Sequence, residues 1–204
     1  MKLYNFANAT NPRRVRMFLA EKGIEVPMVT VDLMKGEHRT AEFLARDPAG
    51  RLPLLELDDG SFLSESVAIC RYFDAIQPEP PLFGRNGREI AEIEMWQRRA
   101  ELELYLPISN AFRHSSPAAK ALQPVQVADW AALCRERAAE CMGWIDARLA
   151  DRDYLAGEMF SIADITAFCA LGLGTNTRTI EVASDLENLQ RWRQIVGERP
   201  SATA

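Results

Sequence analysis

The stretch that decides the fold runs from residue 47 to residue 66 and reads DPAGRLPLLELDDGSFLSES. Within it, two short apolar runs at residues 53–57 and 61–63 flank Asp58-Asp59-Gly60. An Asp-Gly pair between two apolar runs is a strong signal for a β-hairpin turn. The residues that follow, 65–76, are predicted to form a helix. The stretch therefore predicts a hairpin that leads directly into a helix.

Upstream of the hairpin, strand-like and helix-like segments alternate. The expected strands are residues 2–6 and 26–33, and the expected helices are residues 12–22 and 41–46. Gly23 ends the first helical pattern, because glycine suits the position just after a helix. The predicted order is β-α-β-α-β-β-α, which indicates an α/β domain over residues 1–80.

Downstream of this domain the composition changes. Gln77-Pro78-Glu79-Pro80-Pro81 cannot continue a helix and is predicted to be a linker. Only helical patterns follow it, at residues 88–112, 124–149, 162–173 and 186–196. Pro107 is expected to bend the first of these helices, and Ser161-Ile162-Ala163-Asp164 matches a capping box that opens the third. Residues 86–204 are therefore predicted to be an all-α domain, a helical bundle.

The composition narrows the class of function. The formal net charge is −5, from 24 basic and 29 acidic residues, which argues against a general nucleic-acid-binding protein. No apolar run reaches the ~18 residues that span a bilayer, and the first residues lack a signal peptide's apolar core. A cytoplasmic protein without a membrane partner is therefore expected. The cysteines (Cys70, Cys134, Cys141 and Cys169) show neither disulfide nor metal-site spacing, so buried, reduced thiols and no metal are expected.

The segment Thr10-Asn11-Pro12-Arg13-Arg14 has the features of a helix start. Asn11 is a favourable N-cap residue, and Pro12 suits the first helical position. The free N–H groups and the positive dipole end of a helix favour an anion, and the two arginines add positive charge. Taken alone, however, the segment is interpreted as an ordinary helix cap.

Two segments beside the hairpin offer further polar groups. If the Leu52-Pro53 bond is cis, the Leu52 backbone is turned outward and is free to pair with a peptide. Only about 5–6% of X-Pro bonds are cis, so local sequence favours a trans proline at the edge of the sheet. Ser64-Glu65-Ser66 combines a helix N-terminus, a hydroxyl and a carboxylate, which together can hold an amino-acid zwitterion. Taken alone, this segment is also interpreted as capping chemistry.

Together, the order and spacing of these segments resemble the cytosolic glutathione transferases, particularly the theta-like and related bacterial members. The resemblance covers essentially the whole chain and rests on residues 11–16, 20–23, 47–53 and 64–69 in the first domain and on residues 161–164 and 192–200 in the second. It implies an N-terminal thioredoxin-like domain (βαβαββα), a C-terminal helical bundle and a homodimer.

The resemblance also implies a glutathione-binding site, whose residues are His38, Arg51, Leu52, Pro53, Glu65 and Ser66. Pro53 matches the family's cis-proline, and Leu52 would pair its backbone with the cysteinyl part of glutathione. Glu65 and Ser66 would hold the γ-glutamyl end. The two basic side chains match positions that contact the glycyl carboxylate in similar proteins.

One position departs from the family pattern. Members often place a Ser, Tyr or Cys side chain after the first strand to stabilise the glutathione thiolate, and Ala9 occupies the matching position here. We expect the N-terminus of the first helix to take over this role through backbone N–H groups near Pro12 and Arg13. The hydroxyl of Thr10 or the amide of Asn11 would assist, which makes these two the candidate catalytic residues.

The resemblance therefore implies a glutathione S-transferase that conjugates the glutathione thiolate to hydrophobic electrophiles, a detoxification reaction. Glutathione is a co-substrate, and no cofactor is expected. The helical domain would contribute the hydrophobic-substrate site around residues 96–112, between the domains. Two alternatives stay open: another glutathione-dependent activity (peroxidase, disulfide reductase or isomerase) and a non-catalytic interaction module on the same fold. An interaction module has no need of the glutathione-binding residues, which favours the enzyme.

Overall fold

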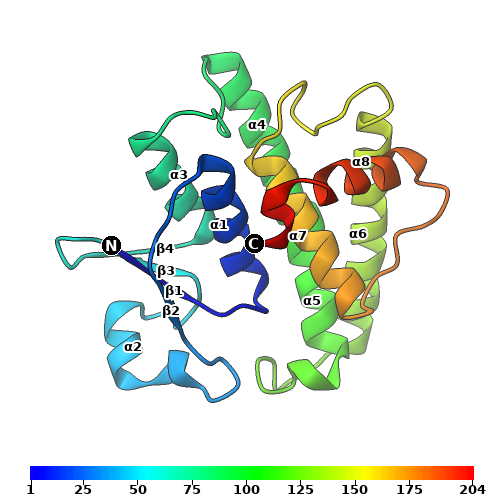
Figure 1. Ribbon diagram of the computed structural model, residues 1–204. Helices are drawn as coiled ribbons and strands as arrows, with labels where there is room; N and C mark the ends of the chain where they lie inside the picture. The colour runs from blue at the N-terminus through cyan, green and yellow to red at the C-terminus, as the bar shows by residue number, and fades with distance from the viewer. The chain divides into compact units, whose positions relative to one another are not determined.

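A four-stranded sheet organises the N-terminal part of the computed structural model, which describes residues 1–204. The strands are β1 (Lys2–Asn5), β2 (Met28–Thr30), β3 (Leu54–Glu56) and β4 (Phe62–Ser64), in the order β2-β1-β3-β4 (Figure 1). β1 is parallel to β2 and antiparallel to β3, and β3 is antiparallel to β4. The predicted β3–β4 hairpin is confirmed, and Gly60 takes the left-handed φ of 82° that its turn requires.

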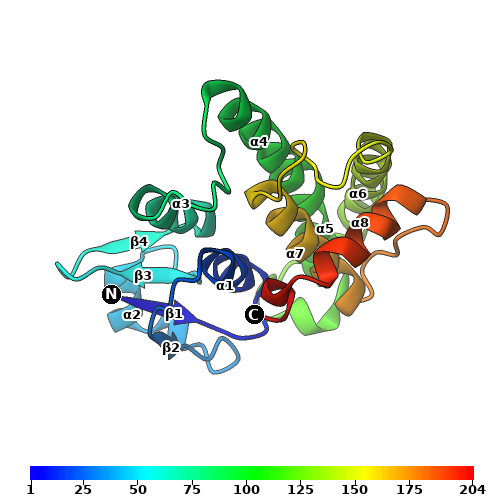
Figure 2. The same cartoon turned by 45° about the horizontal axis from the view of Figure 1, so that its top comes forward.

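Three α-helices cover the two faces of this sheet. They are α1 (Thr10–Lys22), α2 (Ala41–Arg46) and α3 (Ser66–Ile76), and a 3-10 turn, η1 (Glu37–Arg39), precedes α2. α1 and α3 pack together on one face and α2 lies on the other (Figure 2). Alternation along the strands explains the two layers: Leu3 and Leu55 are fully buried, while Tyr4 and Leu54 belong to a cluster with Phe43 of α2. The predicted βαβαββα order is confirmed.

The first unit comprises Met1–Pro81 and Pro200–Ala204. A buried lysine binds residues 77–80, near the end of its long segment. The side chain of Lys22, in the last turn of α1, has no exposed surface. Its ammonium donates to Asp74 Oδ1 at 2.5 Å and to the carbonyl oxygens of Gln77, Pro78 and Pro80 at 2.8, 3.0 and 2.6 Å. A buried charge is tolerated when its donors are satisfied in this way. Lys22 therefore holds the start of the proline-rich linker against α1.

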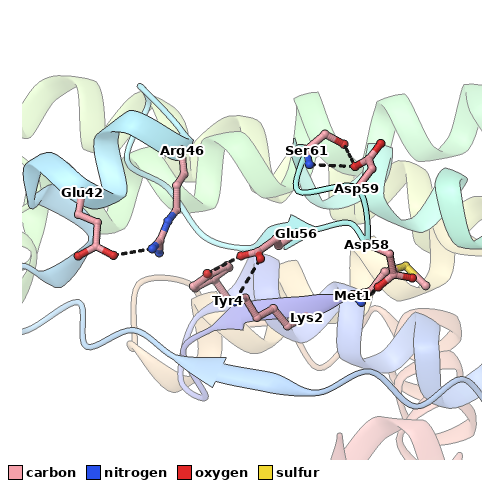
Figure 3. Close-up of polar contacts among 9 residues, drawn as sticks. All are labelled: Met1, Lys2, Tyr4, Glu42, Arg46, Glu56, Asp58, Asp59 and Ser61. Atoms are coloured by element: carbon pink, nitrogen blue, oxygen red, sulfur yellow. Dashed lines mark hydrogen bonds and ion pairs between the residues drawn. The ribbon is translucent and has the colours of Figure 1, made fainter.

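The α2 face of the sheet carries a polar cluster near its exposed margin (Figure 3). Glu56 of β3 lies opposite Lys2 of β1 and pairs with its ammonium at 3.2 Å, and it also accepts a hydrogen bond from the Tyr4 hydroxyl at 2.7 Å. The Arg46 guanidinium lies 5.2 Å from the centre of the Tyr4 ring. The Tyr4 hydrogen bond and then Lys2 lower the pKa of Glu56 below its ordinary value of 4.5.

We expect the Glu56→Gln substitution to remove one acid-sensitive part of the stability. Because the folded pKa of Glu56 lies below its unfolded value, its contribution is complete above about pH 4.5 and is lost as the pH falls through the folded pKa. The free energies of unfolding of wild type and variant, measured in urea between about pH 6 and pH 3, should therefore converge at low pH. A constant difference over that range would contradict this role, and Glu140→Gln on α6 (Ala128–Arg148) controls for net charge.

The second unit, Leu82–Arg199, is helical. Its first helical stretch is continuous from α4 (Gly87–Arg99) through a π-helical segment, η2 (Ala100–Tyr105), to α5 (Leu106–Ser115). The bend expected at Pro107 stays a prediction; the π segment ends at Tyr105, two residues before the proline, whose missing N–H and ring disturb the preceding turn. The remaining helices are α6, α7 (Ile162–Asn176), α8 (Glu187–Gly197) and the 3-10 turn η3 (Pro117–Ala119); η4 (Pro200–Thr203) belongs to the first unit.

α7 forms the core of the helical unit, and Asp164 in its first turn anchors it. The carboxylate accepts hydrogen bonds from Leu155 N and Trp192 Nε1, both at 2.9 Å, and from the Ser161 N–H and hydroxyl at 3.0 and 2.9 Å. Burial raises the pKa of Asp164, and these donors favour the charged form. The predicted capping box is confirmed, and its carboxylate also reaches the segment before α7 and the indole of α8.

α6 is less buried than its sequence suggests. Its apolar residues predict a single wide core stripe, but Trp144 is 51% exposed and Leu133 is 40% exposed, whereas Cys134, Cys141 and Ile145 are buried. The four cysteines are all buried and none forms a disulfide. Burial raises the pKa of Cys141 to about 12, so it stays a thiol at neutral pH. None of the helices combines the length and the apolar composition needed to cross a membrane.

Candidate functional site

Three segments of the chain meet where β1 and β4 end and β3 begins, a place called the sheet edge below. Tyr4 of β1 pairs with Leu54 of β3, and Leu54 pairs with Ser64 of β4. Tyr4 lies near the C-terminal end of β1, Leu54 is the first residue of β3, and Ser64 is the last of β4. The register therefore brings together the loop that leads into α1, the Leu52-Pro53 peptide and the start of α3. These are the segments that carry most of the predicted site residues.

The start of α1 differs from the prediction. The N-cap is Ala9, so Asn11 is not the cap and Pro12 is the third helical residue, not the first. A proline is tolerated throughout the first turn because the N–H it lacks has no partner within the helix there. The first helical hydrogen bond runs from Arg13 N to Ala9 O at 3.1 Å, so the Arg13 N–H is not available to a ligand.

The free donors at this helix start belong to the two predicted catalytic residues. The backbone N–H groups of Thr10 and Asn11 precede the first helical bond, and the Thr10 hydroxyl makes no hydrogen bond. The Asn11 side-chain oxygen is buried without a hydrogen-bond partner. Arg16 fixes the preceding loop by donating to Asn5 Oδ1 at 2.6 Å and to Ala7 O at 2.8 Å. The helix start thus combines unused polar groups with a firmly held loop.

The Leu52-Pro53 peptide bond is cis. The resemblance implied this geometry, whereas the local sequence alone favoured trans. Leu52 is buried in the cluster under α2, and its backbone N–H and carbonyl form no hydrogen bond within the chain. These two groups sit just before β3 and are free to pair with an extended peptide, as a further strand would.

The start of α3 offers a hydroxyl, a carboxylate and free amides. Glu65 takes a left-handed φ of 66° and is exposed, while Ser66 is buried. The first helical bond of α3 runs from Ile69 N to Glu65 O at 3.0 Å, which leaves the N–H groups of its first turn unused by the helix. A left-handed φ at a non-glycine residue is uncommon and is often found at functional sites.

Arg14 is a site residue whose partner the sequence analysis did not identify. Its side chain is almost completely buried, and its guanidinium donates to the Ser66 hydroxyl at 2.8 Å. The bond joins α1 to α3 across 52 residues of sequence and places a positive charge behind the start of α3. A signal was available: Arg14 precedes Phe18 by one helical turn, so a charged residue lies on the buried face of α1.

The two predicted basic contacts differ in character. Arg51 is exposed, its side chain has no partner, and its backbone N–H donates to Asp47 Oδ2 at 3.0 Å. His38 is buried in η1, and its Nδ1 has no partner. Burial, followed by the charge of Arg39, lowers the pKa of His38, so the imidazole is neutral at pH 7. The two residues lie on neighbouring segments, because a Cβ at Gly50 would lie 2.8 Å from the His38 carbonyl oxygen.

Two family models match the chain in succession. The glutathione S-transferase N-terminal domain matches residues 10–76, which include α1 to α3. The glutathione S-transferase C-terminal domain matches residues 128–194, which begin at α6 and end within α8. One match therefore lies in each unit of the structure.

Individual relatives agree with these matches. Glutathione S-transferase 2 of Saccharomyces cerevisiae is 38% identical over 98% of this chain and 87% of its own length. The crystal structure of a glutathione S-transferase domain-containing protein from Marinobacter aquaeolei is also 38% identical, with a TM-score of 0.95, 98% of this chain and 99% of that chain covered. Elongation factor 1-gamma of Prunus avium is 30% identical over 94% of this chain, which spans 45% of that protein's length.

Proposed function

The chain belongs to the glutathione S-transferase family, and we propose that it conjugates the thiolate of glutathione to small hydrophobic electrophiles at the sheet edge described above. The observation that carries the proposal is the convergence of the α1 start, the free Leu52 backbone and the α3 start at that edge. Glutathione is the co-substrate, no cofactor takes part, and the protein works in the cytoplasm. The helical unit supplies apolar surface for the electrophile.

The groups at the edge match the three parts of glutathione. The Leu52 N–H and carbonyl pair with the cysteinyl backbone, as one strand pairs with another. The carboxylate of the γ-glutamyl residue binds at the start of α3, to the free amides and to the Ser66 hydroxyl that Arg14 orients. The ammonium of the same residue pairs with Glu65. The glycyl carboxylate pairs with the exposed Arg51, with neutral His38 as a second, uncharged donor.

In this arrangement the cysteinyl thiol of glutathione lies at the start of α1, where Thr10 and Asn11 have donors that no other group of the chain uses. A helix start stabilises an anion by about 0.3–1 kcal/mol at an exposed site and by up to ~2 kcal/mol when it is partly buried. A charge-assisted hydrogen bond adds roughly 1.5–3 kcal/mol. Together these terms reach the ~2.7 kcal/mol that corresponds to lowering a thiol pKa by about two pH units. Neither Thr10 nor Asn11 needs to supply the whole effect.

The buried cysteines favour conjugation over disulfide chemistry. A reductase that forms a mixed disulfide needs an accessible thiolate, and all four cysteines here are buried. A non-catalytic interaction module, the second class of function, has no use for glutathione. Two assays separate the alternatives: calorimetric titration with millimolar glutathione, and conjugation of glutathione to 1-chloro-2,4-dinitrobenzene. Saturable binding with conjugation supports the transferase, and absence of any glutathione binding refutes the proposal.

We expect Ser66→Ala to weaken glutathione binding by roughly 1–3 kcal/mol, because it removes a hydrogen bond to a carboxylate. It also leaves a buried Arg14 donor without its hydroxyl partner. Calorimetry measures the change directly. Ser61→Ala, the same substitution beyond the other end of β4, is the control and should bind glutathione like the wild type. Equal affinities for all three proteins would rule out Ser66 as a ligand residue.

The proposal includes a homodimer, which is typical of the family. Met95, Leu102 and Leu106 on the first helical stretch of the second unit are all more than 40% exposed. On the same stretch Ile90 is also exposed, whereas Ile93 and Ala100 are buried within the unit. Sedimentation at micromolar concentration should give about twice the 22.9 kDa of one chain. Leu102→Lys should shift the mass toward the monomer, whereas Leu133→Lys on α6 should not; a monomeric wild type would contradict the prediction.

A further inference from the structure

The last residues of the chain pack on α1, the helix whose start is the proposed thiolate site. The helical unit ends at Arg199, and Pro200–Ala204 belong to the first unit together with the sheet. This segment, Pro200–Ala204, is called the strap; its turn η4 packs against α1, and the C-terminus lies beside that helix in both views (Figures 1 and 2). Ser201 and Ala202 are only 3% and 8% exposed, so the strap is an integral part of the first unit.

Two neighbouring strap residues bind the two ends of α1. The guanidinium of Arg13, in the first turn, donates from Nη2 to Ala202 O at 2.7 Å. The Ser201 hydroxyl donates to Glu21 Oε1 in the last turn. Arg13 and Glu21 are eight residues apart, which is about 12 Å along the helix axis. The strap therefore holds α1 near both of its ends, which fixes the position of the helix along its axis.

The start of α1 has no side-chain cap. Its N-cap residue is Ala9, which carries no acceptor, whereas a Ser, Thr, Asp or Asn side chain would hold the first N–H groups in place. The first turn of a helix frays easily because its N–H groups lack partners within the helix. Here those groups belong to Thr10 and Asn11, and a catalytic group misplaced by about 1 Å can cost about 100-fold in rate. The Arg13 contact thus fastens the turn in which precise placement matters most.

We propose that Arg13 and the strap are positioning elements for thiolate activation, an inference that rests on the proposed function. The Ala202 carbonyl holds the Arg13 side chain, and Arg13 in turn holds the first turn of α1. That turn keeps the N–H groups of Thr10 and Asn11 directed at the glutathione sulfur. Arg13 acts through the helix and not by touching glutathione. Its effect therefore falls on the thiol pKa and on kcat, while the affinity for glutathione depends on the residues that hold its peptide parts.

Arg13→Met tests the first step, because it removes the guanidinium and keeps an apolar stem. The thiol pKa of bound glutathione should rise by about 0.5–1 pH unit, and kcat for conjugation should fall about five-fold. KM for glutathione should stay within about two-fold of the wild-type value. Arg71→Met, at an exposed arginine of α3 in the same unit, is the matched control and should leave all three quantities unchanged. A thiol pKa that Arg13→Met does not change would overturn the proposal.

A double-mutant cycle separates positioning from a direct effect of the Arg13 charge. A chain that ends at Arg199 lacks the strap and should show the same rise in thiol pKa and the same loss of kcat. Adding Arg13→Met to that chain should lower kcat by less than about two-fold more, because the two changes break one contact. Losses that multiply would mean that the Arg13 charge acts on the thiolate directly, and would overturn the proposal. If the shortened chain does not fold, Ala202→Lys takes its place, since it sets a like charge beside Arg13.

Hydrogen exchange of α1, measured without glutathione, tests the hold of the strap by itself. The backbone amides of Arg14 and Val15 should exchange about ten-fold faster in Arg13→Met and in the shortened chain than in the wild type or in Arg71→Met, because the first turn opens more often. Wild-type exchange rates in both strap variants would overturn the proposal. A wild type that conjugates no glutathione would refute the proposed function, and the exchange rates would still decide whether the strap fastens the start of α1.

Discussion

Replacing Asp164 by alanine is expected to lower the free energy of unfolding by about 3–5 kcal/mol. The fully buried carboxylate accepts four hydrogen bonds, from Leu155, Trp192 and twice from Ser161. The substitution strands all four donors in a place that water does not reach, and each stranded donor is costly. Because these donors come from the segment before α7, from its N-cap and from α8, the helical unit should loosen as a whole.

Three further variants make this expectation specific. Asp164→Asn keeps the shape but places an NH2 group among donors, so it should lose nearly as much stability as the alanine variant. Trp192→Phe removes one donor and should cost less. Asp151→Ala, at an exposed aspartate of the same unit, should stay within about 0.5 kcal/mol of the wild type. Urea unfolding followed by circular dichroism gives all four values. An Asp164→Ala protein within about 1 kcal/mol of the wild type would contradict the role of Asp164 as anchor.

The second large effect concerns catalysis at the start of α1. Thr10→Ala and Asn11→Ala should each reduce kcat for glutathione conjugation about ten-fold, and the double variant about 100-fold or more. Each side chain carries a donor, the hydroxyl of Thr10 and the NH2 group of Asn11, beside the backbone amides of the helix start. The two losses are expected to combine because neither side chain alone matches the stabilisation that the thiolate needs.

Stability and binding measurements serve as controls for these variants. Since Ala9 is the N-cap of α1, Asn11→Ala removes no helix cap and should change the free energy of unfolding by less than about 0.5 kcal/mol. Glutathione affinity should stay close to the wild-type value, because the peptide parts of the ligand are held elsewhere. A loss confined to KM with kcat intact would show that Thr10 and Asn11 bind glutathione without activating it.

Local signals account for the elements that the sequence predicted best. Asp58-Asp59-Gly60 defines the hairpin because its turn geometry depends only on those residues, and Ser61 closes it by donating to Asp59 at 2.9 and 2.6 Å. Ser161 and Asp164 define the start of α7 in the same way, since a capping box spans four consecutive residues. Neither feature needs information from the rest of the chain.

Features that depend on distant residues were not predictable in this way. The sequence around Pro53 favours trans, and only the family resemblance implied the cis bond that is present. Arg14 can be recognised as misplaced on a buried face, but its partner Ser66 is 52 residues away. The exposure of Trp144 depends on which faces of α6 other helices cover, and amphipathic spacing alone does not settle that.

The predicted start of α1 was wrong by two residues because two positions competed as the N-cap. Asn11-Pro12 is a good N-cap and first-turn pair, but Ala9 takes the extended N-cap conformation instead. The loop held by Arg16 fixes where the chain leaves β1, and this tertiary constraint overrides the local preference. The shift matters for the site, since the free backbone N–H groups belong to Thr10 and Asn11, whereas they were expected near Pro12 and Arg13.

The most direct test of the account is the pKa of the thiol of bound glutathione, measured by titrating the ultraviolet absorbance of its thiolate in complex with the wild type and with Thr10→Ala/Asn11→Ala. The account predicts a pKa about two pH units below that of free glutathione in the wild-type complex, and a clearly smaller lowering in the double variant, where only the backbone amides of the helix start remain. A wild-type complex that titrates like free glutathione, or a double variant that keeps the lowered value, would contradict the placement of thiolate activation at the start of α1.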